Sequence, residues 1–347
     1  MFDIKVCEWL LENGDTPVRY RVLRELFEDK IAAKKIENEL INHNEVQKWL
    51  INLRNENPPA GWYYEHGSFD VCLENALPKL VQLGLHGGLQ VLDKAAEFYL
   101  SRYNSTDFRW ISVNMFNYSG IIMDELTKIA LDQLDRINRF TQKKTYDFYI
   151  SENERALLKK VPKNWKNSNF IKPEISYAQD FDYPYIYDLL GLFRLYDLKN
   201  TTIDKKINDI IDYISVDEFH LKVQDCYGIL IAGKDKYYGQ GWDPKYPGWF
   251  DAVNYIENVN APKLLFFTQI IVKYPSAVKT KWFYELIKYL ETYKTNTGTY
   301  IFPKEWLKET QGYAVMGHHL SFGENRRKKN WCEIESTIYM QLLLKNI

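Results

Sequence analysis

The densest group of titratable side chains in the sequence lies near its C-terminal end. His318 and His319 are adjacent, and Glu324 and Arg326 follow shortly after them. A histidine beside a carboxylate can exchange a proton at neutral pH, and a nearby arginine can orient an anionic group. We therefore expect His318 and His319 to act as acid–base residues, with Glu324 and Arg326 contacting a substrate. The alternative is a solvated surface loop, because a basic run continues to Lys329.

Two aspartates one residue apart form a second candidate for proton transfer. Asp180 and Asp182 lie in an aromatic segment that ends with Tyr183 and Pro184. In a dry aromatic cavity, burial would keep one carboxyl group protonated near neutral pH, so that it could serve as a general acid. The alternative is a turn with solvated carboxylates, because this composition is common in loops.

Aromatic residues are unusually abundant. The chain has 26 Tyr, 18 Phe and 10 Trp, which together make up 16% of its residues. Tyr and Trp have an apolar body and a polar tip, and their ring faces attract cations and stack on sugars. The alternative role is packing between helices, which we expect for roughly half of such residues. The predicted substrate-binding aromatic residues are Trp62, Tyr64, Tyr183, Trp242, Trp249 and Trp331.

The elements that must position these groups are helices. Apolar residues recur at helical spacing, as in Leu73, Ala76, Leu77 and Leu80, and strand-like alternation is scarce. Gly and Pro total only 29 residues, so helix breakers are few. We predict an all-α chain. Its helices are expected near residues 16–26, 31–40, 44–53, 73–81, 91–99, 120–139, 185–197, 203–214, 263–274, 280–293 and 331–345.

Two irregular tracts, residues 161–184 and 233–250, interrupt the helices. Both are rich in aromatic and turn residues, and long loops of this kind in a compact helical protein usually carry function. A weak internal repeat is also visible, since Gly-Trp, Glu-Asn and Pro-Lys-Leu occur twice in that order. Hairpin repeats bury their apolar faces against neighbouring repeats. The two copies run from Gly61 to Leu80 and from Gly248 to Leu264.

The repeat pattern resembles that of a known superfamily. Gly61-Trp62 followed by Asp70-Val-Cys-Leu-Glu-Asn-Ala-Leu, and Gly323-Glu-Asn-Arg followed by Trp331-Cys-Glu-Ile-Glu-Ser-Thr, are similar to repeats of terpenoid cyclases and protein prenyltransferases. The resemblance implies an α-α toroid over residues 56–347, whose central cavity holds the substrate. Residues 1–55 resemble HEAT-like helical hairpins, which we expect to pack on the toroid.

The sequence departs from this superfamily at its catalytic motifs. The acidic motif Asp-x-Asp-Asp of class II cyclases is matched only by Asp180-Phe-Asp182-Tyr, which lacks the last carboxylate. The zinc-binding Asp-x-Cys pair of prenyltransferases is matched by Asp70 and Cys72, with His318 or His319 as the third ligand. Such a mixed ligand set suits Zn²⁺. We favour the alternative, a helix-capping Asp70 and a buried Cys72.

The charge balance and the missing sequence motifs argue against several classes of protein. Lys and Arg total 45 and Asp and Glu total 46, which argues against a globally basic nucleic-acid binder. The sequence shows no signal peptide, no run of 18 apolar residues and no Cys-x-x-Cys pair, so we predict a cytoplasmic protein without a membrane span and with reduced cysteines, three of the four buried. It also has neither a glycine-rich phosphate loop nor a Gly-x-Ser-x-Gly motif.

These observations predict a cytosolic helical protein whose aromatic central cavity binds a small or elongated organic substrate. The resemblance suggests an enzyme similar to terpenoid cyclases or prenyltransferases. Two alternatives stay open. One is a glycan-active (α/α) barrel, a lyase or a hydrolase, which would place two carboxylates across an aromatic groove. The other is a non-catalytic helical-repeat protein that binds a partner along a concave face.

Overall fold

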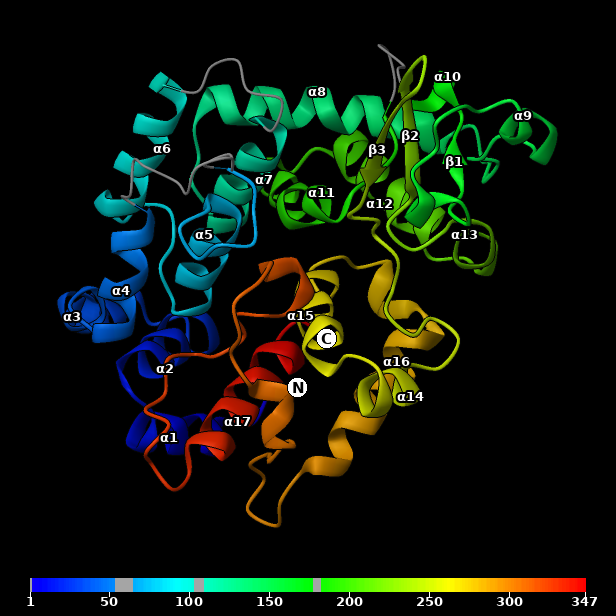
Figure 1. Ribbon diagram of the computed structural model, residues 1–347. Helices are drawn as coiled ribbons and strands as arrows, with labels where there is room; N and C mark the ends of the chain where they lie inside the picture. Colours follow the sequence, from blue (N-terminus) through cyan, green and yellow to red (C-terminus); the bar gives the residue numbers. More distant parts are fainter. Residues whose placement is uncertain (1, 54–64, 103–108, 177–181) are drawn as a thin grey trace.

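The protein is built mainly from helices (Figure 1). The computed structural model describes residues 2–53, 65–102, 109–176 and 182–347. The α-helices are α1 (Ile4–Asn13), α2 (Thr16–Arg21), α3 (Lys30–Ile41), α4 (Asn44–Leu53), α5 (Leu73–Gln82), α6 (Gln90–Arg102), α7 (Arg109–Ser119), α8 (Asp124–Thr141), α9 (Glu152–Ala156), α10 (Pro173–Ser176), α11 (Ile186–Gly191), α12 (Thr201–Ile214), α13 (Asp217–Lys222), α14 (Ala252–Asn258), α15 (Ala261–Ile271), α16 (Lys281–Leu290) and α17 (Trp331–Leu344). A π-helix, η1 (Val22–Leu26), continues α2, and short 3₁₀ helices include η3 (Leu192–Leu198), η6 (Lys304–Leu307) and η7 (Ala314–Met316).

One group of helices is buried on nearly every side. It consists of α5, α7, α11, α15 and α17, which we call the inner helices. All six residues of α11, nine of the ten in α5 and ten of the fourteen in α17 are buried. In Figure 1 these helices lie inside, with α3, α4, α6, α8, α12 and α16 around them. A helix buried all round belongs to the interior of a protein, and α7, α15 and α17 accordingly carry apolar residues on every side, whereas α5 keeps an apolar stripe.

The surrounding helices are amphipathic. In α8 the buried residues Leu126, Ala130, Leu134 and Ile137 fall on one face at helical spacing. The same spacing occurs in α12 and in α16, which face the interior with isoleucines and with Trp282, respectively. The apolar stripe therefore predicts the outer helices well.

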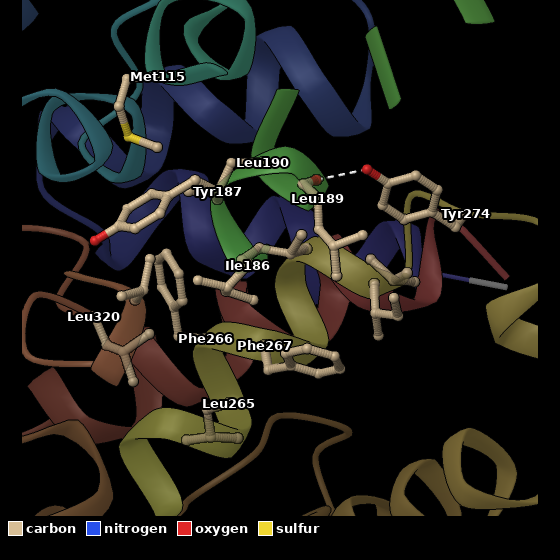
Figure 2. Packing of buried hydrophobic residues seen from close by; sticks show 14 of the residues in the cluster. Met115, Ile186, Tyr187, Leu189, Leu190, Leu265, Phe266, Phe267, Tyr274 and Leu320 are labelled. Atoms are coloured by element: carbon tan, nitrogen blue, oxygen red, sulfur yellow. Dashed lines mark hydrogen bonds between the residues drawn. The ribbon is translucent and has the colours of Figure 1, made fainter. Parts of the chain in front are cut away.

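Apolar side chains fill the space between α7, α11 and α15. Figure 2 shows Met115, Ile186, Leu190 and Phe266 packed against one another there. Helices α7 and α11 approach closely because Gly191 has no side chain: a methyl group at this position would lie 2.3 Å from the amide oxygen of Asn114. The described part of the interior is therefore a packed core.

Buried tyrosines tie the inner helices together through backbone carbonyl groups. The hydroxyl group of Tyr274 donates a hydrogen bond to the carbonyl of Leu189 in α11, at 2.6 Å (Figure 2). Tyr339 of α17 does the same to Leu265 of α15, at 2.8 Å. A buried phenol needs such a partner, because an unsatisfied polar group in the core is costly.

A small sheet corrects the all-α prediction. Strand β1 (Phe170–Ile171) pairs in parallel with β2 (Gly228–Gly233), which pairs antiparallel with β3 (Lys236–Gln240). Part of the tract 233–250, which we expected to be irregular, is therefore a strand. The strands are too short for a clear alternating pattern: β1 has two residues, and β3 is largely exposed.

Most of the predicted helices are confirmed, but α7, α9, α10, α13 and α14 were not predicted. Helix α7 mixes serine and asparagine with apolar residues on all sides, so it lacks the stripe on which the prediction relied. The helix expected from residue 120 begins at Asp124, because Gly120 adopts a left-handed conformation with φ of 80° and ends the preceding segment.

The internal repeat does not correspond to equivalent positions in the fold. Pro78 lies inside α5, whereas Pro262 is in the first turn of α15. Glu74 is buried at the start of α5, whereas Glu257 is exposed near the end of α14. The matching letters therefore do not show that the two segments are structural repeats. Gly61 and Trp62 lie outside the described residues.

Two further predictions concern the cysteines and membrane-spanning segments. All four cysteines are free; Cys7, Cys72 and Cys332 are buried and Cys226 is exposed, as predicted. Among the described residues, no helix combines the length and the apolar character needed to cross a membrane.

A buried lysine connects the first inner helix to the segment that precedes the last one. Lys79 of α5 is 1% exposed, forms an ion pair with Glu309 and donates a hydrogen bond to the carbonyl of Ser321 at 2.8 Å. One turn later, Gln82 donates to the carbonyl of Leu320, also at 2.8 Å. These contacts hold the chain between η6 and α17 against α5.

We predict that Lys79→Met destabilises the protein by about 3 kcal/mol, because it leaves Glu309 without its counter-ion and the carbonyl of Ser321 without its donor. The free energy of unfolding, measured by urea denaturation, checks this value. The matched variant Lys281→Met removes an exposed pair with Glu285 and should change stability by less than about 0.5 kcal/mol. Equal effects of the two substitutions would contradict the assigned role of Lys79.

Candidate functional site

The amino ends of three inner helices carry a connected set of polar and aromatic side chains. Glu74 lies in the first turn of α5, Trp110 in that of α7 and Tyr187 in that of α11. His66, from the loop before α5, and Trp242, which follows β3, contact this set. We call these five residues, together with Tyr313, the amino-end site.

Glu74 is the centre of the amino-end site. Its carboxylate, 1% exposed, accepts hydrogen bonds from the backbone N–H of Gly67 and from the hydroxyl group of Tyr187. The Nδ1 atom of His66 lies 2.7 Å from Oε1 of the same carboxylate. Glu74 therefore joins an imidazole and a phenol that come from two different segments of the chain.

The neighbouring asparagine fixes the loops that deliver these groups. The amide nitrogen of Asn75 donates to the carbonyls of Gly67 and Phe69, at 2.8 and 2.9 Å. Its amide oxygen accepts from the backbone N–H of Ala314, at 2.8 Å. The loop of His66 and the segment of Tyr313 are thus held on the same turn of α5, and their rings stack with centroids 5.6 Å apart.

The rings of the site form a continuous row. The ring of Trp242 meets that of His66 edge-on at 4.5 Å and lies 6.1 Å from that of Tyr187. Trp110 continues the row, 5.7 Å from Tyr187 and 4.9 Å from Tyr185. His66, Trp110 and Trp242 are only partly buried, so part of each ring remains accessible. A row of this kind can hold an organic molecule by stacking.

Trp242 adopts an unusual backbone conformation. Its φ is 68°, in the left-handed region that side chains other than glycine rarely occupy. Its carbonyl accepts a hydrogen bond from the backbone N–H of Ile186 at 2.8 Å, which joins the end of β3 to the start of α11. Strained residues persist where surrounding contacts enforce them, and they cluster at functional sites.

The protonation states follow from burial. Burial and the neighbouring Glu74 carboxylate raise the pKa of Tyr187 well above 10, so that its hydroxyl group remains a donor. The Nδ1 atom of His66 lies within ion-pairing distance of this carboxylate, but without the geometry of a hydrogen bond. A histidine beside a carboxylate is suited to proton transfer.

The two histidines predicted as catalytic have structural contacts. Nδ1 of His318 lies 2.6 Å from the hydroxyl group of Thr310, within one loop. His319 is buried against Trp49, and its Nε2 lies 3.0 Å from the carbonyl of Gly312. Among the described residues, no hydrogen bond or ion pair joins either histidine to Asp182. These contacts close the loop that presents Tyr313.

The predicted partners of the histidines also have structural contacts. Glu324 is buried and accepts from the backbone N–H of Asp15 and from Lys328, so it ties the N-terminal helices to the chain before α17. Arg326 pairs with the buried Glu335 at 2.9 Å, and its guanidinium group lies 3.9 Å from the ring centroid of Trp331. This group lies at the start of α17, and no contact among the described residues links it to the amino-end site.

The predicted acid pair is only partly described. Asp180 lies outside the described residues, as do Trp62 and Tyr64. Asp182 accepts a hydrogen bond from Gln133 of α8 at 3.4 Å, and burial raises its pKa to about 6. Tyr183 is buried beside Phe140, Phe148 and Tyr185. Asp182 thus borders the row of rings at its Tyr185 end.

Trp249 belongs to a different cluster from Trp242. Its ring stacks on that of His220 at 4.5 Å, and its indole N–H donates to Asp217 at 2.8 Å. Tyr246 and Trp282 complete this cluster, which lies among α13, α15 and α16. Of the predicted substrate-binding aromatic residues that the structure describes, only Trp242 lies in the amino-end site.

The predicted zinc ligands are not gathered into a metal site. Among the described residues, no group of three or more His, Cys, Asp or Glu side chains is arranged to hold a metal ion. Cys72 is buried at the cap position of α5, and burial raises its pKa to about 11, so its thiol stays protonated. The histidine nearest Asp70 is His319, at 3.9 Å, and not His318.

Five members of the amino-end site were not predicted from the sequence: His66, Glu74, Trp110, Tyr187 and Tyr313. One signal was available, because Glu74 and Asn75 interrupt the apolar stripe at the start of a helix that the pattern places in the core. A buried carboxylate needs partners. Their identity depends on which loops reach that turn, and the pattern of residue types does not contain this information.

No protein-family model, curated protein sequence or solved structure matches the chain.

We predict that Asp182→Asn changes the pH dependence of stability. Because the pKa of Asp182 is raised in the folded state, its stabilising contribution is present below about pH 4 and is lost as the pH rises through 6. The stability of the wild type relative to the variant should fall by up to about 1.4 kcal/mol per pH unit in this window. Urea denaturation at pH 4, 5, 6 and 7 measures it, with the surface variant Asp197→Asn as control. A difference that is constant with pH would contradict the assignment.

Proposed function

We propose that the protein is an enzyme that binds a small or elongated organic molecule at the amino-end site and transfers a proton through His66. The observation that carries this proposal is the buried Glu74 carboxylate, which has the Nδ1 atom of His66 at 2.7 Å and the Tyr187 hydroxyl group on its other oxygen. An imidazole held by a carboxylate beside partly accessible aromatic rings is a common arrangement for acid–base catalysis.

The division of roles follows from accessibility and from hydrogen bonding. Glu74 is the counter-ion of the protonated His66 ring, and Tyr187 keeps that carboxylate in place. Trp110, Trp242 and Tyr313 supply the partly exposed ring faces against which a substrate would stack. Tyr187 is a positioning residue, because its hydroxyl group is used by Glu74.

We also propose that the helices are arranged as an α-α toroid. Several contacts support it: α5 packs on α7, α7 on α11 and α11 on α15. Tyr339 links α17 to α15, and Lys79 and Gln82 link α5 to the segment before α17. These links join the first inner helix to the last. On this proposal the chain resembles the terpenoid cyclase and prenyltransferase superfamily in architecture, with its site at the amino ends of the inner helices.

We predict that Trp242→Ala weakens substrate binding about 5- to 30-fold, because it removes one ring of the row. Farnesol, an isoprenoid chain, and maltohexaose, a glycan, serve as probes in saturation-transfer NMR and calorimetry. The control Trp249→Ala alters an aromatic cluster outside the site. Saturable binding of farnesol supports the toroid-enzyme proposal. Binding of maltohexaose alone favours a glycan-active protein, and binding that both variants weaken equally would overturn the site.

We predict that His66→Gln abolishes turnover while leaving the fold intact. Wild-type protein is incubated with a small-molecule extract, and mass spectrometry identifies the compounds that it consumes. The rate of their loss should fall about 10²- to 10⁴-fold in His66→Gln and also fall in Glu74→Gln, since both remove the acid–base group or its orientation. The control His43→Gln should retain the rate. Unchanged turnover in His66→Gln would overturn the catalytic role.

A further inference from the structure

A cavity lies at the carboxyl ends of inner helices, opposite the amino-end site. Its volume is about 380 Å³, and the carboxyl ends of α5, α7, α15 and α17 border it together with η1 and η3. Glu74 and Gln82 mark the two ends of α5, about 12 Å apart along the helix. The cavity is therefore separate from the amino-end site.

Five cationic side chains converge on this cavity. Only two carboxylates, Glu25 and Glu28, line it with them. The protein as a whole has a net charge of −1, so the excess of positive charge is local. The cationic residues are Arg21, Arg24, Arg194, Lys273 and Lys345.

The two carboxylates are used by two of the five cations. Arg21 forms a two-pronged ion pair with Glu25, at 2.6 and 2.9 Å, and Lys345 pairs with Glu28 at 2.8 Å. Although burial opposes it, the charge of Arg21, with further contributions from Lys273 and Arg24, lowers the pKa of Glu25 to about 2. Glu25 is therefore fully ionised and already paired.

The other three cations have no carboxylate of their own. Arg24 has no hydrogen bond or ion pair among the described residues. Lys273 donates only to the amide oxygen of Asn346, at 3.2 Å. Arg194 makes one long hydrogen bond to the carbonyl of Tyr118, at 3.4 Å, and its Nε atom is buried without a hydrogen-bond partner among the described residues.

Helix dipoles account for only part of this arrangement. Cations are favoured at the carboxyl ends of helices, where they bind the last carbonyl groups. Arg21 and Arg194 do so at the carbonyls of Gln82 and Tyr118. Arg24 and Lys273 make no such bond among the described contacts. Burial lowers the pKa of both Arg24 and Lys273; attraction to Glu25 opposes this shift, and repulsion from Arg21 and Arg194 adds to it.

We propose that this cavity binds a phosphorylated small molecule, held by Arg24, Arg194 and Lys273. A phosphate group carries close to two negative charges and several acceptor oxygens, and guanidinium groups match its geometry. The walls also include Val81, Leu85, Phe193 and Leu342, which suit an organic body attached to the phosphate. The volume falls within the range of small-molecule sites.

The backbone at the rim supports this assignment. Arg24 and Glu25 lie on the π-helix η1. π-Helices are rare in proteins, and those that occur are frequently found at functional sites. Because η1 directly continues α2, Arg21 at the end of α2 lies at the cavity together with Arg24 and Glu25 of η1. Arg194 of η3 and Lys273 after α15 also line it. Three separate segments thus supply the three unpaired cations.

Inorganic pyrophosphate is the probe for this site. We expect calorimetry to give saturable binding with a dissociation constant below about 1 mM at low salt, and the thermal unfolding temperature to rise with pyrophosphate but not with sodium chloride of equal ionic strength. Arg194→Gln and Lys273→Gln should each weaken binding by about 10- to 100-fold. The control Lys281→Gln, at an 86% exposed side chain, should leave binding unchanged.

Stability without ligand provides a second readout. Since Lys273 is partly buried and lies near Arg21 and Arg194, Lys273→Gln should unfold at the same temperature as the wild type or higher when no phosphate is present. His66→Gln should bind pyrophosphate normally, which separates this site from the proposed catalytic one. The assignment is overturned if pyrophosphate produces no more stabilisation than chloride, or if Lys281→Gln weakens binding as much as Lys273→Gln does.

Discussion

The structure depends on one constraint: polar groups carried into the interior by fully buried helices must find partners there. Helix α5 shows this most clearly, since Glu74, Asn75, Lys79 and Gln82 are all buried among its apolar residues. Leaving such groups unsatisfied would cost several kcal/mol in total. Each of them instead binds a loop, a neighbouring helix or the segment before α17. The irregular parts of the chain are therefore placed by the polar residues of the inner helices.

The two ends of the inner helices carry different charged side chains. Carboxylates occupy the first turns of α5 and α11, where Glu74 and Asp188 lie near the positive ends of the helix dipoles. Cations gather at the carboxyl ends, where the dipoles are negative. Asp188 accepts from Asn114 and from the backbone of Tyr185, and its burial raises its pKa to about 8.

The sequence pattern predicts the outer helices and four of the five inner ones, but it does not predict α7. The stripe in α8 specifies one face, so both its existence and its orientation could be expected. Helix α7 has no stripe, because every side of it meets protein, and a periodicity argument therefore overlooks it. The candidate site was likewise predicted only in part. Trp242 was predicted from its aromatic tract, whereas the pairing of His66 with Glu74 depends on a loop closure that local spacing does not encode.

Adjacent titratable residues in a sequence are a weak guide to chemistry for a related reason. His318 and His319 are neighbours in the chain, yet their side chains bind Thr310 and Gly312 and close a loop. That loop brings Tyr313 to the ring of His66, so the contacts of His318 and His319 help to position a residue of the amino-end site. A solitary histidine beside a buried glutamate on an inner helix is the stronger indication of proton transfer. Burial forces those two groups to interact, whereas adjacency in the sequence does not.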